Sequence, residues 1–248
     1  MSLPALSVQG LCKSFGALAV TRGVDLELQP GARVGLIGPN GAGKTTLINL
    51  LSGVLRPDAG HIQLAGVRID RLRPEQRVRH GLARTHQINT LLPEASALDS
   101  VAVAVAERDG LGWRPLRSRS GWARCREEAR ARLEELGLAA VERPVRELPY
   151  GQQRLLEIGI ALALRPRVLL LDEPAAGVPS GEAGVIHEAL ARLPAEMAIL
   201  LIEHDLDLVF RFATELVVLV QGSVLTRDTP DEVRADPRVR AAYLGSRG

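Results

Sequence analysis

The chain has 248 residues and a formal net charge of +2, with 46% hydrophobic and 24% charged residues. These values predict an α/β domain with a sizeable core. The small net charge argues against a strong positive electrostatic field of the kind that attracts nucleic acid. Cys12 and Cys125 have neither disulfide-framework nor metal-site spacing, which favours a reducing compartment. We find no signal-peptide pattern and no apolar run of the roughly 20 residues that a membrane helix needs. If the protein works at a membrane, a partner must hold it there.

The N-terminal part of the chain predicts strands. Residues 6–8 and 24–28 alternate with a period of two, which is typical of strands with one wet face, and a Pro-Gly turn then leads into the apolar run RVGLI at 33–37. Phe15 is the only aromatic residue before position 38. Two interpretations of it stay open, a ring that stacks on a nucleotide base and an ordinary partly buried side chain.

A glycine-rich loop follows the buried strand. Its sequence, GPNGAGKTT, fits the phosphate-binding pattern of a glycine, four free positions and Gly-Lys-Ser/Thr. Residues 45–55 have helical spacing, so the loop lies at a helix N-terminus, where backbone N–H groups and the helix dipole favour an anion. The predicted nucleotide-binding residues of this loop are Gly38, Pro39, Asn40, Gly41, Ala42, Gly43, Lys44, Thr45 and Thr46.

Three side chains of the loop have predicted roles. Lys44 would reach the β- and γ-phosphates, Thr45 would hold Mg²⁺ through its hydroxyl, and Thr46 would add a donor near the α-phosphate. Only Lys13 and Lys44 among the 31 Lys and Arg residues are lysines. A planar guanidinium does not replace a compact ammonium in a tight phosphate-binding loop. The rare use of lysine at position 44 therefore argues against a chance match to the phosphate-loop pattern.

The middle of the chain changes character. We expect a turn at 57–60, a hairpin at 61–69 folded at Ala65-Gly66, a short helix at 74–80 and a strand at 82–85 that leads to Gln87. From 89 to about 145 strand signals fade, and 124–138 has a helical pattern. We interpret this part as a helical subdomain inserted into an α/β core. Its interleaved Arg and Glu residues are typical of a solvated or protein-contacting face rather than a nucleic-acid patch.

Two later apolar runs end in polar residues. The run at 168–171 delivers Asp172 and Glu173 to the C-terminal end of a strand, where ligands bind in parallel α/β sheets. Asp172 would sit near Mg²⁺, and Glu173 would accept a proton from the attacking water or orient it. The run at 197–202 precedes His204, which we expect at the same edge of the sheet and in contact with the γ-phosphate.

In this order the motifs resemble those of the ATP-binding subunits of ABC transporters, over essentially the whole chain. The matching sequence has an aromatic loop at Phe15, a Walker A loop at 38–46, a glutamine loop at Gln87, a signature at 148–152, a Walker B strand ending in Asp172-Glu173, a D-loop at 177–180 and a switch histidine at His204. The resemblance implies a P-loop NTPase (RecA-like) α/β core with an N-terminal antiparallel β subdomain and an inserted α-helical subdomain.

The resemblance also implies roles for single residues and a division of the chain. The implied catalytic residues are Lys44, Gln87, Glu173 and His204, the Mg²⁺ ligands are Thr45, Gln87 and Asp172, and the signature contacts to nucleotide come from Tyr150, Gly151 and Gln152. A single ABC ATPase domain, 1–248, would consist of a core with its β subdomain at 1–87 and 156–228, a helical subdomain with the signature at 88–155, and a helical tail at 229–248. The tail begins with a capping box, Thr229-Pro230-Asp231-Glu232.

Finer features resemble the branched-chain amino acid importer branch, which also includes importers of urea and short amides. These features are ARTHQ at 83–87, YGQQR at 150–154, DEPAAG at 172–177, IEHD at 202–205 and the tail sequence at 236–245. The implied partners are a second ABC ATPase subunit, two transmembrane permease subunits and an extracytoplasmic solute-binding protein, with no nucleic acid. The implied location is the cytoplasmic face of the cell membrane.

Two ATPase subunits would face head to tail, each ATP lying between one phosphate loop and the other subunit's signature. Gly151 lies at the start of an expected helix over 152–164, whose N-terminus is a second candidate anion-binding site. Within a monomer, one phosphate tail cannot occupy both this site and the phosphate loop. Pro149 and Tyr150 replace the usual serine and first glycine, and Pro179 replaces the D-loop Asp or Asn. These changes remove hydrogen-bonding groups and favour a heterodimer with a different ATPase, although a homodimer stays open.

Three other interpretations are weaker. A soluble ABC-type protein acting on nucleic acid or ribosomes commonly has two cassettes or a long coiled-coil insertion, and a phosphate-loop kinase or GTPase does not account for 148–152 or His204. A lipopolysaccharide-export ATPase usually has a more standard signature. We therefore expect an ATP-hydrolysing subunit that powers import of a small solute, a branched-chain amino acid or related amide; the solute itself is selected by other chains.

Overall fold

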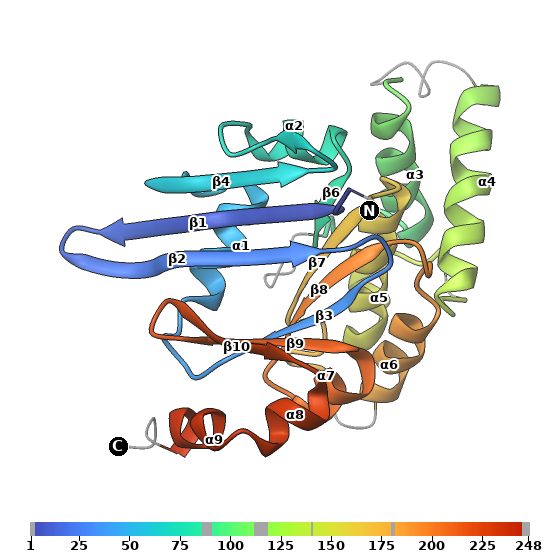
Figure 1. The fold of residues 1–248 in the computed structure, drawn as a ribbon. Helices are drawn as coiled ribbons and strands as arrows, with labels where there is room; N and C mark the ends of the chain where they lie inside the picture. The colour runs from blue at the N-terminus through green and yellow to red at the C-terminus, as the bar shows by residue number, and fades with distance from the viewer. Residues whose placement is uncertain (1–2, 86–90, 112–118, 140, 180–181, 245–248) are drawn as a thin grey trace. The chain divides into compact units, whose positions relative to one another are not determined.

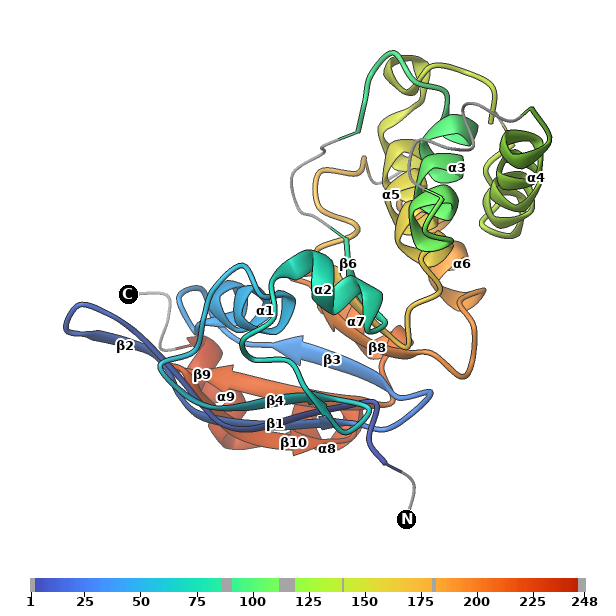
Figure 2. The same ribbon diagram turned by 90° about the horizontal axis from the view of Figure 1, so that it is seen from above.

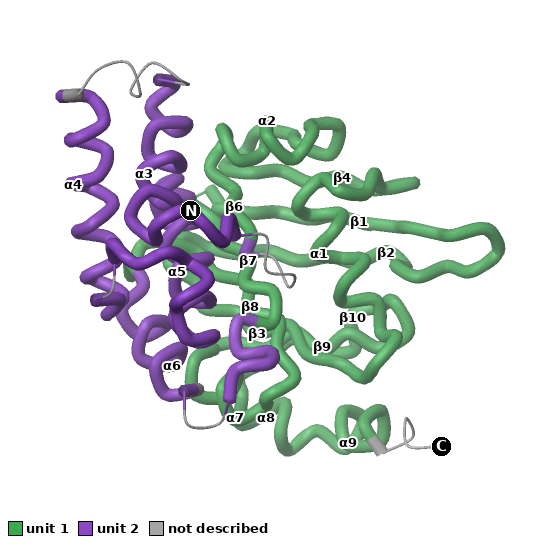
Figure 3. The backbone as a smooth tube through the Cα atoms, turned by 180° about the vertical axis from the view of Figure 1, so that it is seen from behind, with its two compact units in different colours: residues 1–84, 167–173, 194–248 green, residues 85–166, 174–193 purple. Residues whose placement is uncertain are grey.

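The computed structural model describes residues 3–85, 91–111, 119–139, 141–179 and 182–244. The chain forms two compact units, 1–84 with 167–173 and 194–248, and 85–166 with 174–193 (Figure 3). The second unit extends beyond the expected helical subdomain of 88–155, because the helix α5 (Tyr150–Ala163) continues without a break and α6 (Ala183–Ala191) packs against it. The expected subdomain boundaries themselves stay a prediction.

An antiparallel sheet forms one part of the first unit. Its strands are ordered β2-β1-β4-β5, with bounds β1 Leu6–Phe15, β2 Leu18–Leu28, β4 Ala59–Leu64 and β5 Val67–Arg68 (Figure 1). Every second side chain at the end of β2 is buried, which fits a strand with one wet face. The β4–β5 hairpin turns at Ala65 and Gly66, whose φ angles of 46° and 80° suit a two-residue hairpin turn. The predicted hairpin is confirmed.

A six-stranded sheet forms the other part, in the order β10-β9-β3-β8-β7-β6. The bounds are β3 Arg33–Ile37, β6 Leu82–Arg84, β7 Val168–Asp172, β8 Ala198–Ile202, β9 Glu215–Val220 and β10 Ser223–Asp228. All pairs are parallel except β9–β10. Residue Ile202 pairs with Leu36 of β3 and with Asp172 of β7, so the carboxyl ends of these three strands meet at one edge.

The helices of the first unit are α1 Lys44–Ser52, α2 Pro74–Arg79, α7 Leu206–Phe212, α8 Pro230–Ala235 and α9 Pro237–Leu244. Four buried residues of α1 share one hydrophobic core with the inner side chains of both sheets; they are Leu47, Ile48, Leu50 and Leu51. The ribbon of α1 lies next to that of α2 (Figure 2). The fully buried Arg77 donates to the backbone carbonyls of Leu50 and Leu51 at 2.6 and 2.7 Å, and burial lowers its pKa to about 10. Helix α1 is thereby fixed at its carboxyl end. The predicted capping box at Thr229 is confirmed at the start of α8.

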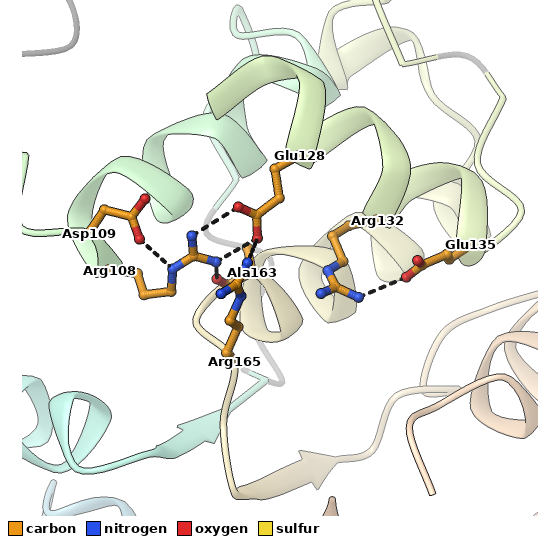
Figure 4. Close-up of polar contacts among 7 residues, drawn as sticks. All are labelled: Arg108, Asp109, Glu128, Arg132, Glu135, Ala163 and Arg165. Carbon is orange, nitrogen blue, oxygen red and sulfur yellow. Dashed lines mark hydrogen bonds and ion pairs between the residues drawn. The ribbon is translucent and has the colours of Figure 1, made fainter. Parts of the chain in front are cut away.

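The second unit is helical, with α3 Ala97–Arg108, α4 Arg119–Glu135, the short 3₁₀ helix η2 Val145–Glu147, α5 and α6. The helical pattern over 124–138 falls in α4, which begins earlier and ends before Gly137, whose φ is 82°. Glu128 of α4 accepts from both terminal nitrogens of Arg108 at 2.6 and 2.9 Å and from Arg165 at 2.9 Å (Figure 4). The bonds from Arg108 and Arg165 lower the pKa of Glu128 to about 2. Several of the interleaved charges of this region therefore form ion pairs within the second unit.

Within the described ranges, no helix has both the length and the apolar character needed to cross a membrane.

Candidate functional site

The glycine-rich loop joins β3 to α1 and leaves no room for side chains at two of its glycines. A Cβ atom on Gly38 would lie 2.1 Å from the Leu219 carbonyl oxygen, and one on Gly43 would lie 2.8 Å from the Val20 carbonyl oxygen. Gly43 precedes α1 with a left-handed φ of 101°, and no side chain forms a capping hydrogen bond at this helix start. The N–H groups of the first turn therefore stay available to an anion, as a phosphate-binding loop requires.

Lys44 is the first residue of α1 and is only 7% exposed. Its Nζ donates to the carbonyl oxygens of Gly38 at 2.6 Å and Pro39 at 3.2 Å. Burial lowers the pKa of Lys44, and the nearby Glu173 carboxylate opposes that shift. The ammonium group is thus held inside the loop by neutral acceptors.

The structure brings Glu173 and His204 together. Glu173 follows β7 in a left-handed conformation with φ of 50°, and its N–H donates to the Ile202 carbonyl of β8 at 2.8 Å. His204 follows β8, and its Nε2 lies 2.9 Å from Glu173 Oε1. The imidazole is 54% exposed whereas the carboxylate is 14% exposed. A carboxylate held this way at a strand end has the position of a general base for a reaction beside the phosphate loop.

A cavity of about 220 Å³ joins these elements. Its lining residues are Val20, Asn40, Gly41, Ala42, Gly43, Lys44, Thr45, Thr46, Glu173 and His204. Two larger cavities of the first unit have volumes of about 680 and 590 Å³, but neither is lined by the start of α1 or by Glu173 and His204. The candidate site is therefore identified by its lining residues and not by its volume. Sequence reasoning missed Val20, because an apolar residue in a strand carries no functional signal.

Phe15 lies at the end of β1 and is 48% exposed. It is not among the residues that line the cavity, and its ring centroid lies 5.8 Å from Lys13 Nζ. Stacking of Phe15 on a nucleotide base stays a prediction.

Two of the predicted Mg²⁺ ligands are described, and both offer oxygen atoms; Thr45 lines the cavity, whereas Asp172 is not among its lining residues. Asp172 ends β7 with 3% of its surface exposed, and Thr45 lies in the first turn of α1. Among the described residues no cluster of three or more His, Cys, Asp or Glu could hold a metal. Such a cluster is unnecessary for Mg²⁺, which is usually bound by one or two protein oxygens together with substrate phosphates and water. Gln87, the third predicted ligand, lies outside the described residues.

One contact of Asp172 was not predicted. Its Oδ2 accepts from Arg84 Nη2 at 2.8 Å, and Arg84 comes from the neighbouring strand β6. The signal was present in the sequence, since a charged side chain inside a strand of a parallel sheet needs a buried partner.

The signature residues lie in the second unit, at the start of α5. The helix begins at Tyr150 rather than at the expected residue 152, because Pro149 has a φ of −53° that suits the position before a helix. The Gly151 N–H donates to Glu182 Oε2 at 2.8 Å, and the Tyr150 hydroxyl accepts from Arg154 Nη2 at 2.8 Å. Sequence reasoning gave no role to Glu182 or Arg154.

The third signature residue, Gln152, is half-buried in the first turn of α5. Its side-chain oxygen has no hydrogen-bond partner within the part of the chain that the structure describes. The contact of Gln152 with a nucleotide stays a prediction, as do those of Tyr150 and Gly151.

A parallel sheet in which a central strand passes through a phosphate loop into a helix, with carboxylates at the end of the next strand but one, defines a P-loop nucleoside triphosphatase. The family model described as ABC transporter matches residues 21–176, and the model described as branched-chain amino acid ATP-binding cassette transporter matches residues 223–248. The chain belongs to the ATP-binding subunits of ABC transporters and is an ATPase, as predicted.

Curated relatives cover nearly the whole chain. The high-affinity branched-chain amino acid transport ATP-binding protein BraF of Pseudomonas aeruginosa is 40% identical over 254 residues, which covers 99% of each chain. LivG of Escherichia coli K12, which has the same description, is 40% identical over 253 residues with the same coverage. The lipopolysaccharide export system ATP-binding protein LptB of Acidithiobacillus ferridurans is 36% identical over 242 residues, covering 97% of this chain and 96% of its own.

Solved structures confirm the predicted fold class. The ADP conformation of an ATP-binding cassette of an ABC transporter has a TM-score of 0.83 at 30% identity, covering 98% of this chain and 100% of the other. A nucleotide-free ATP-binding cassette has a TM-score of 0.80 at 30% identity, covering 96% and 97%.

Proposed function

We propose that the chain is the ATP-hydrolysing subunit that powers import of branched-chain amino acids or a related amide. One observation carries the hydrolytic part, the cavity in which the phosphate loop and Lys44 meet the Glu173–His204 pair. The solute class is supported by the names of BraF and LivG and by the family match over 223–248. That match favours an importer over lipopolysaccharide export, for which LptB is the relative.

Phosphate binding, Mg²⁺ binding and proton transfer are assigned to different residues of the site. Lys44 and the N–H groups of the first turn of α1 bind the phosphate oxygens, and Thr45 with Asp172 and Gln87 would hold Mg²⁺. When bound, Mg²⁺ would neutralise phosphate charge. Glu173 accepts the proton of the attacking water, and His204 orients the Glu173 carboxylate through the 2.9 Å contact and reaches the γ-phosphate.

The proposed partners are a second ATPase subunit, two transmembrane permease subunits and an extracytoplasmic solute-binding protein, which place the chain at the cytoplasmic face of the membrane. We favour a different chain as the second ATPase. The Tyr150 hydroxyl and the Gly151 N–H, which would face the partner's nucleotide, are both engaged within their own chain, and Pro179 adds no donor. Cooperative ATP hydrolysis by the purified chain alone, at the rate of a complete transporter, would contradict this pairing.

Hydrolysis is tested with the purified chain beside a Glu173→Gln variant, each also run on size exclusion in ATP and Mg²⁺. Loss of turnover with a new ATP-dependent dimer supports Glu173 as the base in a self-pairing subunit. Weak turnover by a monomeric wild type supports a different ATPase partner. Turnover that survives in Glu173→Gln removes Glu173 from its role.

The solute is tested in native cells that lack the gene, by uptake of radiolabelled leucine, isoleucine, valine, urea and acetamide. We expect branched-chain amino acid or amide uptake to fall and to return with the wild-type gene but not with Glu173→Gln. Unchanged uptake of all five together with a lipopolysaccharide-transport defect would instead support export.

A further inference from the structure

The guanidinium of Arg84 links three elements of the first unit. Its Nη1 donates to Asn49 Oδ1 at 2.7 Å and to Ser52 Oγ at 3.0 Å, and its Nη2 donates to Asp172 Oδ2 at 2.8 Å. Arg84 ends β6, Asp172 ends β7, and the two polar residues belong to α1. One side chain therefore connects the helix of the phosphate loop with the strand that carries the proposed Mg²⁺ carboxylate.

These contacts are largely shielded from water. The Arg84 side chain is 11% exposed and that of Asp172 is 4% exposed. Residues 49 and 52 are three positions apart, so they share the face of α1 from which both contact Arg84. A guanidinium presents its donors in a fixed plane, so Nη1 bound to α1 sets the direction in which Nη2 meets the Asp172 oxygen, whereas an ammonium is a rotatable point charge.

We propose that Arg84 is a positioning residue for the ATPase site: it orients the Asp172 carboxylate relative to α1, and thereby sets the affinity of the site for the divalent cation. The inference rests on the proposed function, because it takes Asp172 and Thr45 as cation ligands. Partners that orient a ligating carboxylate commonly change metal affinity 10- to 100-fold when they are lost. The sequence pattern of a phosphate loop contains no such arginine.

A purely structural role makes a different prediction. If Arg84 only ties β6 to α1, its loss lowers the stability of the fold but leaves cation affinity unchanged in the folded protein. If Arg84 mainly competes with the cation for Asp172, breaking the Arg84–Asp172 contact strengthens cation binding, and the shorter side chain of Arg84→Lys breaks that contact. The direction of change in cation affinity therefore separates positioning from both alternatives.

The experiment uses the full-length chain with ADP, so that hydrolysis does not disturb the equilibrium, and Mn²⁺ as the spectroscopic probe. Electron paramagnetic resonance gives the Mn²⁺ dissociation constant in the presence of ADP, and a fluorescent ADP analogue in EDTA gives nucleotide affinity without the cation. For Arg84→Lys we expect Mn²⁺ affinity to fall about 10-fold, with nucleotide affinity in EDTA close to wild type. Unchanged or tighter Mn²⁺ binding would overturn the proposal.

Two further variants keep the test decisive. Ser52→Ala leaves the Arg84–Asp172 contact and removes one anchor on α1, so it should weaken Mn²⁺ binding in the same direction but less, even if Arg84→Lys folds poorly. Arg227→Lys is the matched control, because Arg227 pairs with Glu215 at 2.6 Å between β10 and β9 and touches no proposed ligand. Loss of Mn²⁺ affinity in Arg227→Lys equal to that in Arg84→Lys would show a general effect of losing an ion pair.

Failure of this inference is distinguishable from failure of the proposed function. If the wild-type chain binds neither ADP nor Mn²⁺ with ADP, the nucleotide site itself is wrong. If the wild type binds both and Arg84→Lys matches it, only the positioning role is wrong.

Discussion

The starts of α1 and α5 are both candidate anion sites, yet they are built differently. At α1 a glycine in a left-handed conformation precedes the helix, no side chain caps it, and Lys44 stays inside the loop. At α5 the Glu182 carboxylate already accepts from the Gly151 N–H at 2.8 Å, and Arg154 holds the Tyr150 hydroxyl. The first start is left open to a ligand, whereas at the second the Gly151 N–H is already bound within its own chain.

The difference teaches that an anion-binding motif is defined by what its donors contact. A carboxylate at a helix N-terminus interacts with the same N–H groups and dipole that would otherwise attract a phosphate. To bind the Gly151 N–H, a phosphate oxygen of a partner's nucleotide must displace the Glu182 carboxylate. This cost supports the proposal that the chain keeps a competent phosphate loop and offers a poorer signature.

The largest effect should come from Glu173→Gln, which tests the chemistry beside the open helix start. Replacing the base by an amide should lower kcat about 100- to 10,000-fold while nucleotide binding persists, because Gln keeps the shape without accepting the proton. Turnover assays with a separate binding measurement check this. The exposed Glu196→Gln in the same unit is the control and should hydrolyse ATP like wild type.

Lys44→Ala tests the same helix start through binding. Removal of a buried ammonium that contacts phosphate should weaken ATP affinity about 100-fold, measured by equilibrium titration with a fluorescent analogue. Lys13→Ala is the control, because Lys13 is the other lysine and forms a surface pair with Asp58 at 2.6 Å. Equal losses in the two variants would contradict a specific phosphate contact by Lys44.

Glu128→Gln tests how far ion pairs hold the helices around α5. Losing its bonds to Arg108 and Arg165 should lower the free energy of unfolding by roughly 2 kcal/mol at neutral pH, measured by urea denaturation. Glu135→Gln is the control, because Glu135 is 62% exposed and pairs only with Arg132 in Figure 4. A Glu135→Gln loss as large as that of Glu128→Gln would argue against the network.

The same carboxylate predicts a pH dependence. Its pKa is lowered to about 2 from an ordinary value of 4.5, so the unfolded chain binds the proton more readily. The stability from Glu128 is therefore present above about pH 4.5 and is lost as the pH falls towards 2. The difference between wild type and Glu128→Gln should shrink over that window, whereas a constant difference would contradict it.

The smallest effect should come from Glu182→Gln, which removes the charge at the α5 start. The helix should lose about 0.5–1 kcal/mol, because a neutral amide interacts less with the N-terminal N–H groups and dipole. Amide hydrogen exchange at Gly151, together with urea denaturation, measures the change. Glu188→Gln on α6, 72% exposed, is the control, and equal effects of the two would remove the special role of Glu182.

Much of the first unit followed from sequence patterns. RVGLI at 33–37 forms β3 as predicted, and the Gly38 to Thr46 loop leads into α1, since these features depend on local hydrophobicity and glycine geometry. The α7 helix was missed because its seven residues are too few for a clear period. The predicted α5 start at residue 152 was two residues late, because the prediction began the helix after Gly151, whereas the helix begins directly after Pro149.

By itself, the sequence determined the family, the phosphate loop, and the strand ends that carry Asp172, Glu173 and His204, because these depend on contiguous residues with local physical meaning. Only the tertiary structure decided that Arg84 of β6 forms hydrogen bonds with Asp172 and with Asn49 of α1. It also decided that the Glu182 carboxylate accepts a hydrogen bond from the Gly151 N–H. Both contacts join residues more than 30 positions apart, and no local period encodes which buried polar group finds which partner. Packing decides it, because a buried charge must be paired where the fold places it.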